Sequence, residues 1–246
     1  MVKFSRRLHN WLGLILVAQI TLWFLSGLVM AVLPIEQVRG EHLRLTLSTP
    51  WQQAAVSPQQ VLKQHGPQAS LSLSQRLNWQ HNQLSTIPVY LVNDAGRLYR
   101  YNAATGDALS PLTEQDIRAL AKAQYQGNGQ LQTARLLQQL PQEVQHLTAP
   151  LWQLQFADSD NSHFYLDPAT GEVLRVRTDS WRWFDFFWML HIMDYQDRSN
   201  FNNPLLITFS ASALLFTLSG IVLLWQRFRP RKYRKTSAAK ADTAPT

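Results

Sequence analysis

Two apolar stretches, residues 12–33 and 205–225, lie near opposite ends of this 246-residue chain. Each runs for about 21 residues without a charged side chain, which is long enough to cross a bilayer core of roughly 30 Å. The segment between them is polar enough to form a water-exposed body. We therefore predict two transmembrane helices, over residues 12–33 and 204–226, that flank one domain over residues 34–180 and leave both chain ends on the same side of the membrane.

Basic residues beside the apolar stretches predict the orientation of the chain. Ten of the 23 basic residues and one of the 16 acidic residues lie in the two tails, 1–11 and 227–246, which leaves 13 basic and 15 acidic residues between the stretches. Because short basic segments stay on the cytoplasmic side, we expect both tails in the cytoplasm and the large domain outside it. The basic second tail is expected to contact membrane lipids. The nearly neutral domain gives no reason to expect a nucleic acid partner.

The first stretch has the basic start of a secretory signal peptide, but its apolar run exceeds the usual ~7–15 residues and no small-x-small cleavage site precedes Pro34. We therefore expect it to remain as an anchor.

The chain contains no cysteine, which excludes disulfides, c-type haem attachment and thiolate metal sites.

The segment between the stretches shows weak internal symmetry. Residues 102–109 and 167–174 both read Asn or Asp, any residue, Ala-Thr-Gly, an acidic residue, any residue and Leu. Each copy predicts a tight turn beside β-hairpins, with strands over 89–92, 97–101, 152–156 and 163–166. Ser57-Pro58 predicts a helix over 59–64, and a capping box of Thr113 and Asp116 predicts one over 114–125. We expect a membrane α+β protein whose extracytoplasmic domain has helices on antiparallel sheet in two related halves.

Residues 181–197 form the most unusual segment, because seven aromatic residues and one histidine lie in residues 181–195, just before the second apolar stretch. Such density predicts an amphipathic helix in the membrane interface, where aromatic rings have an apolar body and a polar tip. Asp185 and Asp194 would be costly at that depth unless they are hydrogen-bonded. We expect them either to anchor this helix or to orient the imidazole of His191 from its second shell.

Three segments together resemble the PepSY-associated transmembrane family. They are the start Arg6-Arg7-Leu8-His9-Asn10-Trp11-Leu12-Gly13-Leu14, the run Leu25-Ser26-Gly27-Leu28, and Trp188-x-Leu190-His191-x-x-Asp194-Tyr195. The Ala-Thr-Gly turns extend the resemblance over nearly the whole chain. Larger proteins that resemble this one have four spans and include ferrisiderophore reductases of the bacterial inner membrane, which carry haem b between membrane histidines. Others occur with flavin-transfer systems. The resemblance therefore implies haem b, with His9 and His191 as axial ligands.

The positions of these residues agree with that expectation. His9 and Gly27 are 18 residues apart and share one face of a helix, with Gly13 about 40° away, so a flat macrocycle could approach the backbone there. The alternative is that Gly13 and Gly27 only permit close helix packing. His9 and His191 lie at opposite ends of the spans, about 30 Å apart, and cannot share one iron. Self-association as a homodimer would supply each histidine twice, whereas His42 is a weaker, intramolecular partner for His191.

Two function classes follow. The first is passage of electrons across the membrane to an extracytoplasmic acceptor, a ferric chelate or a flavinylated protein, as a component of a ferric or flavin-linked transmembrane reductase. The second is a membrane-anchored PepSY binding or regulatory module, of the peptidase-inhibitory type, without a cofactor. The chain has no hydrolase, P-loop or dinucleotide-binding pattern, so no catalytic residue is predicted and the electron donor must come from elsewhere.

Overall fold

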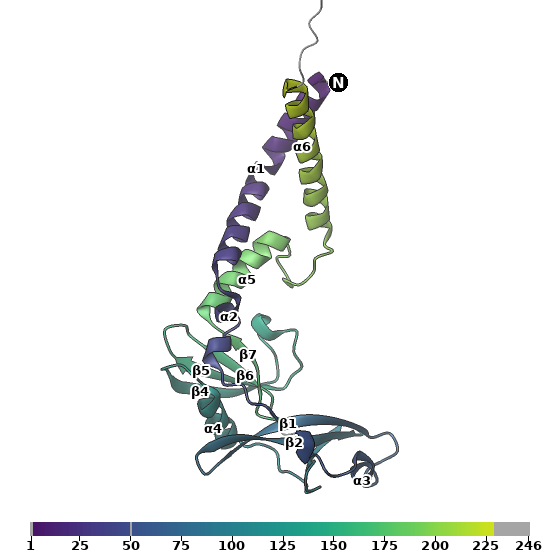
Figure 1. The fold of residues 1–246 in the computed structure, drawn as a ribbon, viewed down its shortest axis with the longest axis vertical. Coiled ribbons are helices and arrows are strands. Elements are labelled where there is room, and N and C mark those ends of the chain that lie inside the picture. Colours follow the sequence, from purple (N-terminus) through teal and green to yellow (C-terminus); the bar gives the residue numbers. More distant parts are fainter. Residues whose placement is uncertain (1, 50, 229–246) are drawn as a thin grey trace, which may run out of the picture.

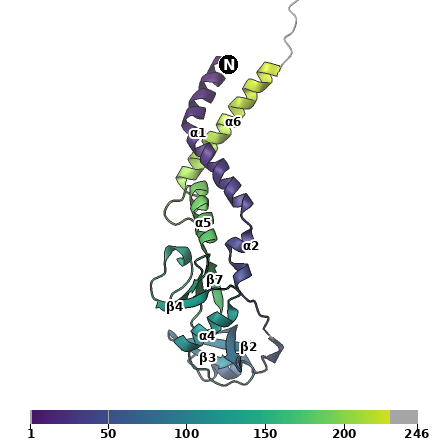
Figure 2. The ribbon, with the colours of Figure 1, turned by 90° about the vertical axis from the view of Figure 1, so that its left-hand side faces the viewer.

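The computed structural model describes residues 2–49 and 51–228, which form a long molecule with two apolar helices at one end and two β-sheets at the other (Figure 1). Helices α1 (Val2–Val32) and α6 (Pro204–Phe228) cross each other, as Figure 2 shows. Both are long and apolar enough to cross a membrane. Large apolar side chains cover their outer surfaces without protein contact, Phe24 being 76% exposed. Helix α1 begins at Val2 and not at residue 12, because the basic segment before the apolar stretch is helical as well. Of the expected tail 227–246, the first two residues belong to α6 and residues 229–246 lie outside the described residues.

The first half of the domain is a three-stranded antiparallel sheet, ordered β1 (Ser70–Gln80), β2 (Gln83–Asp94) and β3 (Arg97–Asn102). The hairpin predicted around residues 93–96 is confirmed, since β2 pairs with β3 across it. Two short helices, η2 (Trp51–Gln53) and α3 (Pro58–Leu62), precede the sheet. Its core is small and joins Val61 of α3 to Tyr90, Val92, Tyr101 and Ala103.

The second half is a four-stranded antiparallel sheet in the order β4 (Gln130–Leu137), β5 (Leu151–Ala157), β6 (His163–Leu166) and β7 (Val173–Arg177). Helix α4 (Glu114–Gln124) packs on it and begins at the predicted capping box. The segment after α1, which holds α2 (Ile35–Val38) and η1 (Glu41–Leu43), is fixed to this half because Leu43 is part of its core. A last short helix, η3 (Gln142–Val144), joins β4 to β5.

The two Ala-Thr-Gly turns have the same hydrogen bonds, which confirms the internal symmetry of the sequence. Asn102 and Asp167 each accept a bond from the backbone N–H four residues later, at Gly106 and Gly171, with N···O distances of 2.8 Å in both copies. Both glycines have positive φ, +85° and +72°. The second turn also joins the halves, because Thr170 accepts a bond from the backbone N–H of Leu77 on β1.

Helix α5 (Asp179–Ile192) connects the second half to the apolar helices. It begins two residues before the expected position 181, because Thr178 directly after β7 caps it by accepting a bond from the Trp181 N–H. It ends at Ile192 rather than at residue 197, because Met193 takes a left-handed conformation with φ of 54°. The chain then turns back over α5 before α6 begins.

A buried polar cluster fixes α5 to the sheet. Glu143 of η3 accepts hydrogen bonds from Tyr165 and His163 on β6 and pairs with Arg182 of α5 at 3.2 Å. Burial alone would raise the pKa of Glu143, but the bonds from His163 and Tyr165 and the charge of Arg182 outweigh it and hold this pKa at about 2. The ionised carboxylate of Glu143 therefore links η3 and β6 to the first turn of α5.

The paired turns predict unequal effects of the same substitution. Gly106→Ala and Gly171→Ala both place a side chain at positive φ, which costs about 1–2 kcal/mol. A Cβ at Gly171 would also lie 2.5 Å from Leu120, which is fully buried and cannot move aside, whereas at Gly106 the nearest atom is 3.6 Å away. Thermal unfolding of the full chain in detergent should show the larger loss of stability for Gly171→Ala. Equal losses would contradict this account.

Substitution of Glu143 should remove the part of the pH dependence of the unfolding free energy that this carboxylate causes. Since the folded-state pKa lies below the ordinary 4.5, the ionised carboxylate stabilises the fold above about pH 4.5, and this contribution is lost as the pH falls toward 2. Glu143→Gln should therefore be less stable than the unsubstituted chain at pH 7, with a difference that narrows between pH 4.5 and 2. Glu114→Gln, which removes an exposed carboxylate paired with Arg118, is the control and should change little. Unfolding followed by circular dichroism measures both.

Candidate functional site

His9 of α1 is held against α6 near the basic ends of both helices. Its Nδ1 lies 2.9 Å from the hydroxyl oxygen of Ser219 and 3.3 Å from the carbonyl oxygen of Phe216. The imidazole stacks on the ring of Phe216, with centroids 4.2 Å apart and planes 10° apart. Its Cε1 would be only 3.1 Å from a Cβ at Gly220, so that glycine makes room for the ring.

His191, near the end of α5, is held against α1 by the same kind of contact. Its Nδ1 lies 2.9 Å from the hydroxyl oxygen of Ser26, and its Cε1 would be 3.7 Å from a Cβ at Gly27. The indole N–H of Trp23 donates to the backbone carbonyl of His191 at 2.8 Å, which fixes the end of α5 on α1. Ser26 is fully buried in this contact.

The serine hydroxyls favour one tautomer of each imidazole. Ser26 lies 2.6 Å from the carbonyl oxygen of Leu22, and Ser219 lies 2.7 Å from the carbonyl oxygen of Phe216. A serine that donates its proton to that carbonyl accepts from the histidine, which corresponds to the tautomer with hydrogen on Nδ1. In this tautomer Nε2 keeps its lone pair, and within residues 2–49 and 51–228 no hydrogen bond reaches Nε2 of either ring.

The two contacts share a sequence signal that our sequence analysis missed. Ser26-Gly27 and Ser219-Gly220 both belong to a Leu-Ser-Gly motif, at residues 25–27 of the first apolar stretch and 218–220 of the second. A search for the same polar motif within both stretches would have found Ser219 and Gly220. In each motif the serine binds Nδ1 and the glycine leaves space for the ring, so each span receives one histidine from another helix.

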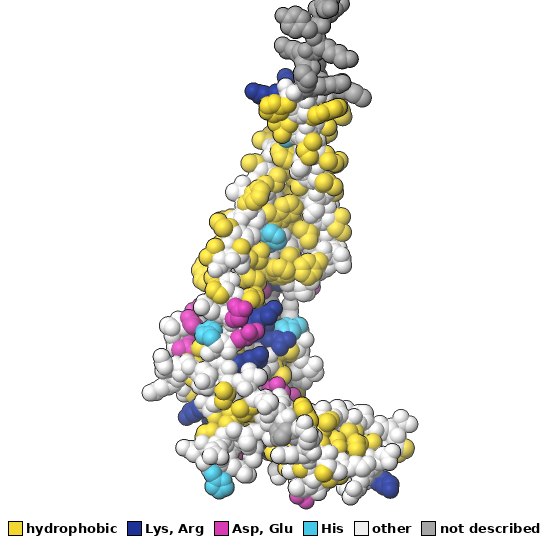
Figure 3. All heavy atoms as spheres, viewed as in Figure 1, with side chains coloured by type: hydrophobic (Ala, Val, Ile, Leu, Met, Phe, Trp, Pro, Cys, Tyr) yellow, Lys and Arg dark blue, Asp and Glu magenta, His cyan; other side chains and the backbone are white. Residues whose placement is uncertain are grey.

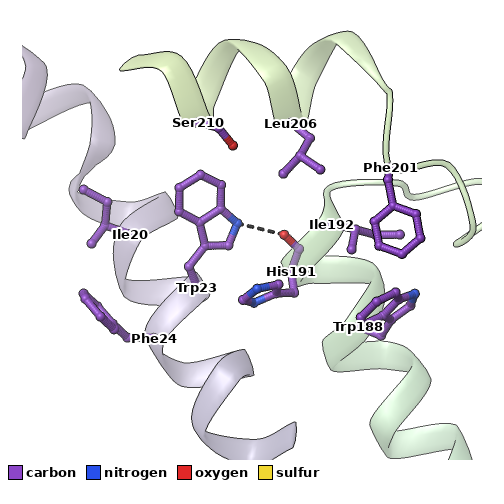
Figure 4. Close-up of a pocket in the computed structure, with 9 residues that line it drawn as sticks. All are labelled: Ile20, Trp23, Phe24, Trp188, His191, Ile192, Phe201, Leu206 and Ser210. Carbon is purple, nitrogen blue, oxygen red and sulfur yellow. Dashed lines mark hydrogen bonds between the residues drawn. The ribbon is translucent and has the colours of Figure 1, made fainter. Parts of the chain in front are cut away.

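A cavity of about 650 Å³ opens where α1, α5 and α6 meet, and His191 forms part of its wall (Figure 4). Apart from Ser210 of α6, its other walls are apolar or aromatic and include Trp23 and Phe24 of α1, Trp188 of α5 and Leu206 of α6. Phe201 of the loop before α6 stacks edge-on against Trp188 and closes one side. The volume is typical of cavities that hold small organic ligands.

The two predicted second-shell acids bind the loop after α5 and not the imidazole. Asp194 accepts hydrogen bonds from four backbone N–H groups, at residues 196, 197, 199 and 200. The bond from Asn200 is the largest of the effects that lower the pKa of the Asp194 carboxyl. Asp185 forms an ion pair with Arg198 of the same loop. Of the two expected roles, the described residues show the anchoring one, while the His191 ring is oriented by Ser26.

The structure also places the remaining predicted residues. Gly13 lies under Phe216, whose ring atom would be 3.0 Å from a Cβ there, so this glycine gives room to an aromatic ring of α6. Gly27 lies beside His191, as described above. His42 is exposed on η1 and does not fold back beside His191, because the next residue, Leu43, is buried in the core of the second half. In the part of the chain that the structure describes, no group of three or more metal-binding side chains occurs.

The hydrogen bond between Ser26 and His191 can be tested directly. Ser26→Ala removes the oxygen that accepts the hydrogen bond from Nδ1, so the share of the tautomer with hydrogen on Nδ1 should fall. Interhelical hydrogen bonds of this kind contribute about 0.6 kcal/mol. The ¹⁵N chemical shifts of the imidazole in histidine-labelled protein report the tautomer. Ser212→Ala is the matched control, because Ser212 lies in α6 and donates to the Thr208 carbonyl. A dominant Nε2–H form in the unsubstituted chain would refute the assignment.

Comparison with known proteins gives one match. The family model described as the PepSY-associated TM region matches residues 6–243, a range that includes both apolar helices, both sheets and both histidine contacts. Neither the curated proteins nor the solved structures include a match to this chain. Because the family model covers nearly the whole sequence, the chain belongs to the PepSY-associated transmembrane family.

Proposed function

We propose that this chain is a two-pass, haem b-binding protein of the bacterial inner membrane that passes electrons across the membrane to an extracytoplasmic acceptor. The acceptor would be a ferric chelate or a flavinylated protein. The observation that carries the proposal is His191, which stands in the wall of an apolar cavity with Nδ1 bound to Ser26 and Nε2 without a partner among the described residues.

The residues around His191 fit a haem. Ser26 holds the ring and leaves Nε2 as a neutral nitrogen ligand, and a hydrogen bond to the other ring nitrogen increases the basicity of such a ligand. Gly27 leaves space beside the ring, and most of the cavity wall beside it is apolar. Haem b, when bound, supplies a one-electron redox couple whose potential is set by its ligands and surroundings.

His9 would serve a second haem at the other end of the bilayer. His9 and the Ser26 contact of His191 are 17 residues apart on α1, which is about 26 Å along the helix. Bis-histidine ligation then needs a second copy of the chain, which supplies His9 and His191 again. Phe24 is exposed at the rim of the cavity, so a second copy can reach the cavity from this side. We therefore propose a homodimer, or an equivalent membrane partner, as the working form.

The helices and the charges support the proposed placement in the membrane. Apolar side chains cover the outer surfaces of α1 and α6, which is favourable only against lipid or another protein. The basic residues 3–7 before the first apolar stretch and 227–235 after the second favour a cytoplasmic location for both ends. The domain with the two sheets is then periplasmic, and the acceptor meets it there.

Visible spectra of the protein purified from haem-supplied cells test the proposal. The reduced-minus-oxidised spectrum should show the α-band of a b-type haem, and His191→Ala should lose the haem of the α5 site. His9→Ala should lose the other haem, so each variant keeps roughly half of the haem per chain. His42→Ala is the control and should keep all of it, since His42 is exposed and lies outside the cavity.

The same preparation separates the proposal from its alternative. A spectrum without haem bands, despite adequate haem supply, would contradict electron transfer and favour a membrane-anchored PepSY binding or regulatory module without a cofactor. Full haem retention in a strictly monomeric preparation would instead contradict the homodimer. Light scattering in detergent, measured on the sample used for the spectra, determines which of these applies.

A further inference from the structure

Four arginines line a second cavity, of about 430 Å³, where α2, η1, β7 and the start of α5 meet. We call it the arginine groove; the residues that matter here are Arg39, Arg44, Arg175, Arg177, Glu41 and Trp181. Glu41 is the one acidic residue in its lining, and it lies 3.7 Å from Arg39. The groove therefore carries a net charge of about +3, and four cations held this close favour an anionic ligand.

Arg177 is the strongest indication of a ligand. Its side chain is 6% exposed, yet in the described part of the chain no carboxylate lies within ion-pair distance of it. It donates from Nε to the backbone carbonyl of Glu143 at 2.8 Å and from Nη1 to the backbone carbonyl of Val176 at 3.2 Å, and it stacks 4.1 Å over the Trp181 ring. All of these partners are uncharged. The nearby acids are already engaged, Glu143 with Arg182 and Asp185 with Arg198. A buried cation without an anion is costly, and a bound anion would compensate it.

The electrostatic effect of this excess charge extends to a neighbour. Burial and then the charge of Arg175 lower the pKa of Arg177 to about 10, so it stays protonated at neutral pH. Burial, followed by the charges of Arg177 and Arg175, also lowers the pKa of His146. The charges of Glu143 and Asp185 act in the opposite direction on Arg177 but do not outweigh burial and the charge of Arg175.

The position of the groove identifies the source of the anion. Arg39 lies seven residues after Val32, the end of α1, and Figure 3 shows a band of charged side chains, Lys and Arg together with Asp and Glu, directly below the apolar part of the molecule. The helices that border the groove also carry exposed apolar side chains, with Ile35 of α2 at 39% and Trp183 of α5 at 62%. Tryptophan at such a boundary is typical of residues at the level of lipid head groups.

We propose that the arginine groove binds the phosphate of an anionic phospholipid in the leaflet next to the domain. Guanidinium groups bind phosphate through paired N–H donors, and Arg39, Arg44 and Arg175 can reach it from the rim while Arg177 closes the base. The acyl chains would lie along the exposed side chains of Ile35 and Trp183. The bound lipid would fix the domain at one height above the bilayer. This inference uses the membrane placement of the chain but does not depend on haem.

Lipid titration of the full chain in detergent tests the site. Native mass spectrometry counts bound phosphatidylglycerol, with phosphatidylcholine as the zwitterionic comparison, and calorimetry measures inorganic phosphate separately. Arg39→Gln with Arg175→Gln removes two exposed cations of the groove and should weaken phosphatidylglycerol binding at least ten-fold. The control pair, Arg97→Gln with Arg135→Gln, makes the same change of net charge at exposed positions on β3 and β4 and should change the affinity less than two-fold.

Each outcome decides the proposal. A loss confined to the groove pair, with phosphatidylglycerol preferred over phosphatidylcholine, supports it. Equal losses in both pairs would overturn it, because binding would then follow net charge alone. Binding of inorganic phosphate that the groove pair abolishes, without a preference for phosphatidylglycerol, would overturn the lipid source and assign the groove to a soluble phosphate. Haem spectra of the groove pair should match those of the unsubstituted chain in every case.

Discussion

The arrangement of the apolar helices depends on two contacts of the same kind, in each of which a histidine packs against a Ser-Gly pair. Helices in lipid gain nothing from removing apolar surface from water, so specific packing and interhelical hydrogen bonds decide how they associate. In this chain His9 joins α1 to α6 through Ser219 and Gly220, and His191 joins α5 to α1 through Ser26 and Gly27. Because α1 takes part in both contacts, it determines where the cavity at His191 opens.

The domain outside the apolar helices contributes to the same site. Helix α5 follows β7 after the single residue Thr178, and the Glu143 cluster binds its first turn to the sheet. The end of α5 is bound in turn to α1 through Trp23 and Ser26. The position of His191 is therefore fixed at both ends of one helix, and a partner that displaced the sheet would also displace the histidine. This link gives a physical route between the PepSY domain and the membrane site.

Two features of the structure favour a cofactor-binding role over a simple anchor. An anchor needs apolar surface, which α1 and α6 have in abundance, but it has no use for two histidines whose Nε2 atoms have no hydrogen-bond partner among residues 2–49 and 51–228. A cavity of about 650 Å³ beside one of them is also more than helix packing requires. The arginine groove lies at the start of α5, and His191 lies near its end. One helix therefore carries both the candidate cofactor ligand and part of the candidate lipid site.

The sequence by itself determined the elements that obey local rules. Length and apolarity identified both long helices, the capping box identified the start of α4, and the repeated Ala-Thr-Gly motif identified two turns of the same kind, because each signal depends on residues a few positions apart. Only the tertiary structure decided which side chains meet. His9 and Ser219 are 210 residues apart and His191 and Ser26 are 165 apart. The roles of Asp185 and Asp194, the exposure of His42 and the grouping of four arginines likewise follow from how separate elements pack, which local periodicity does not encode.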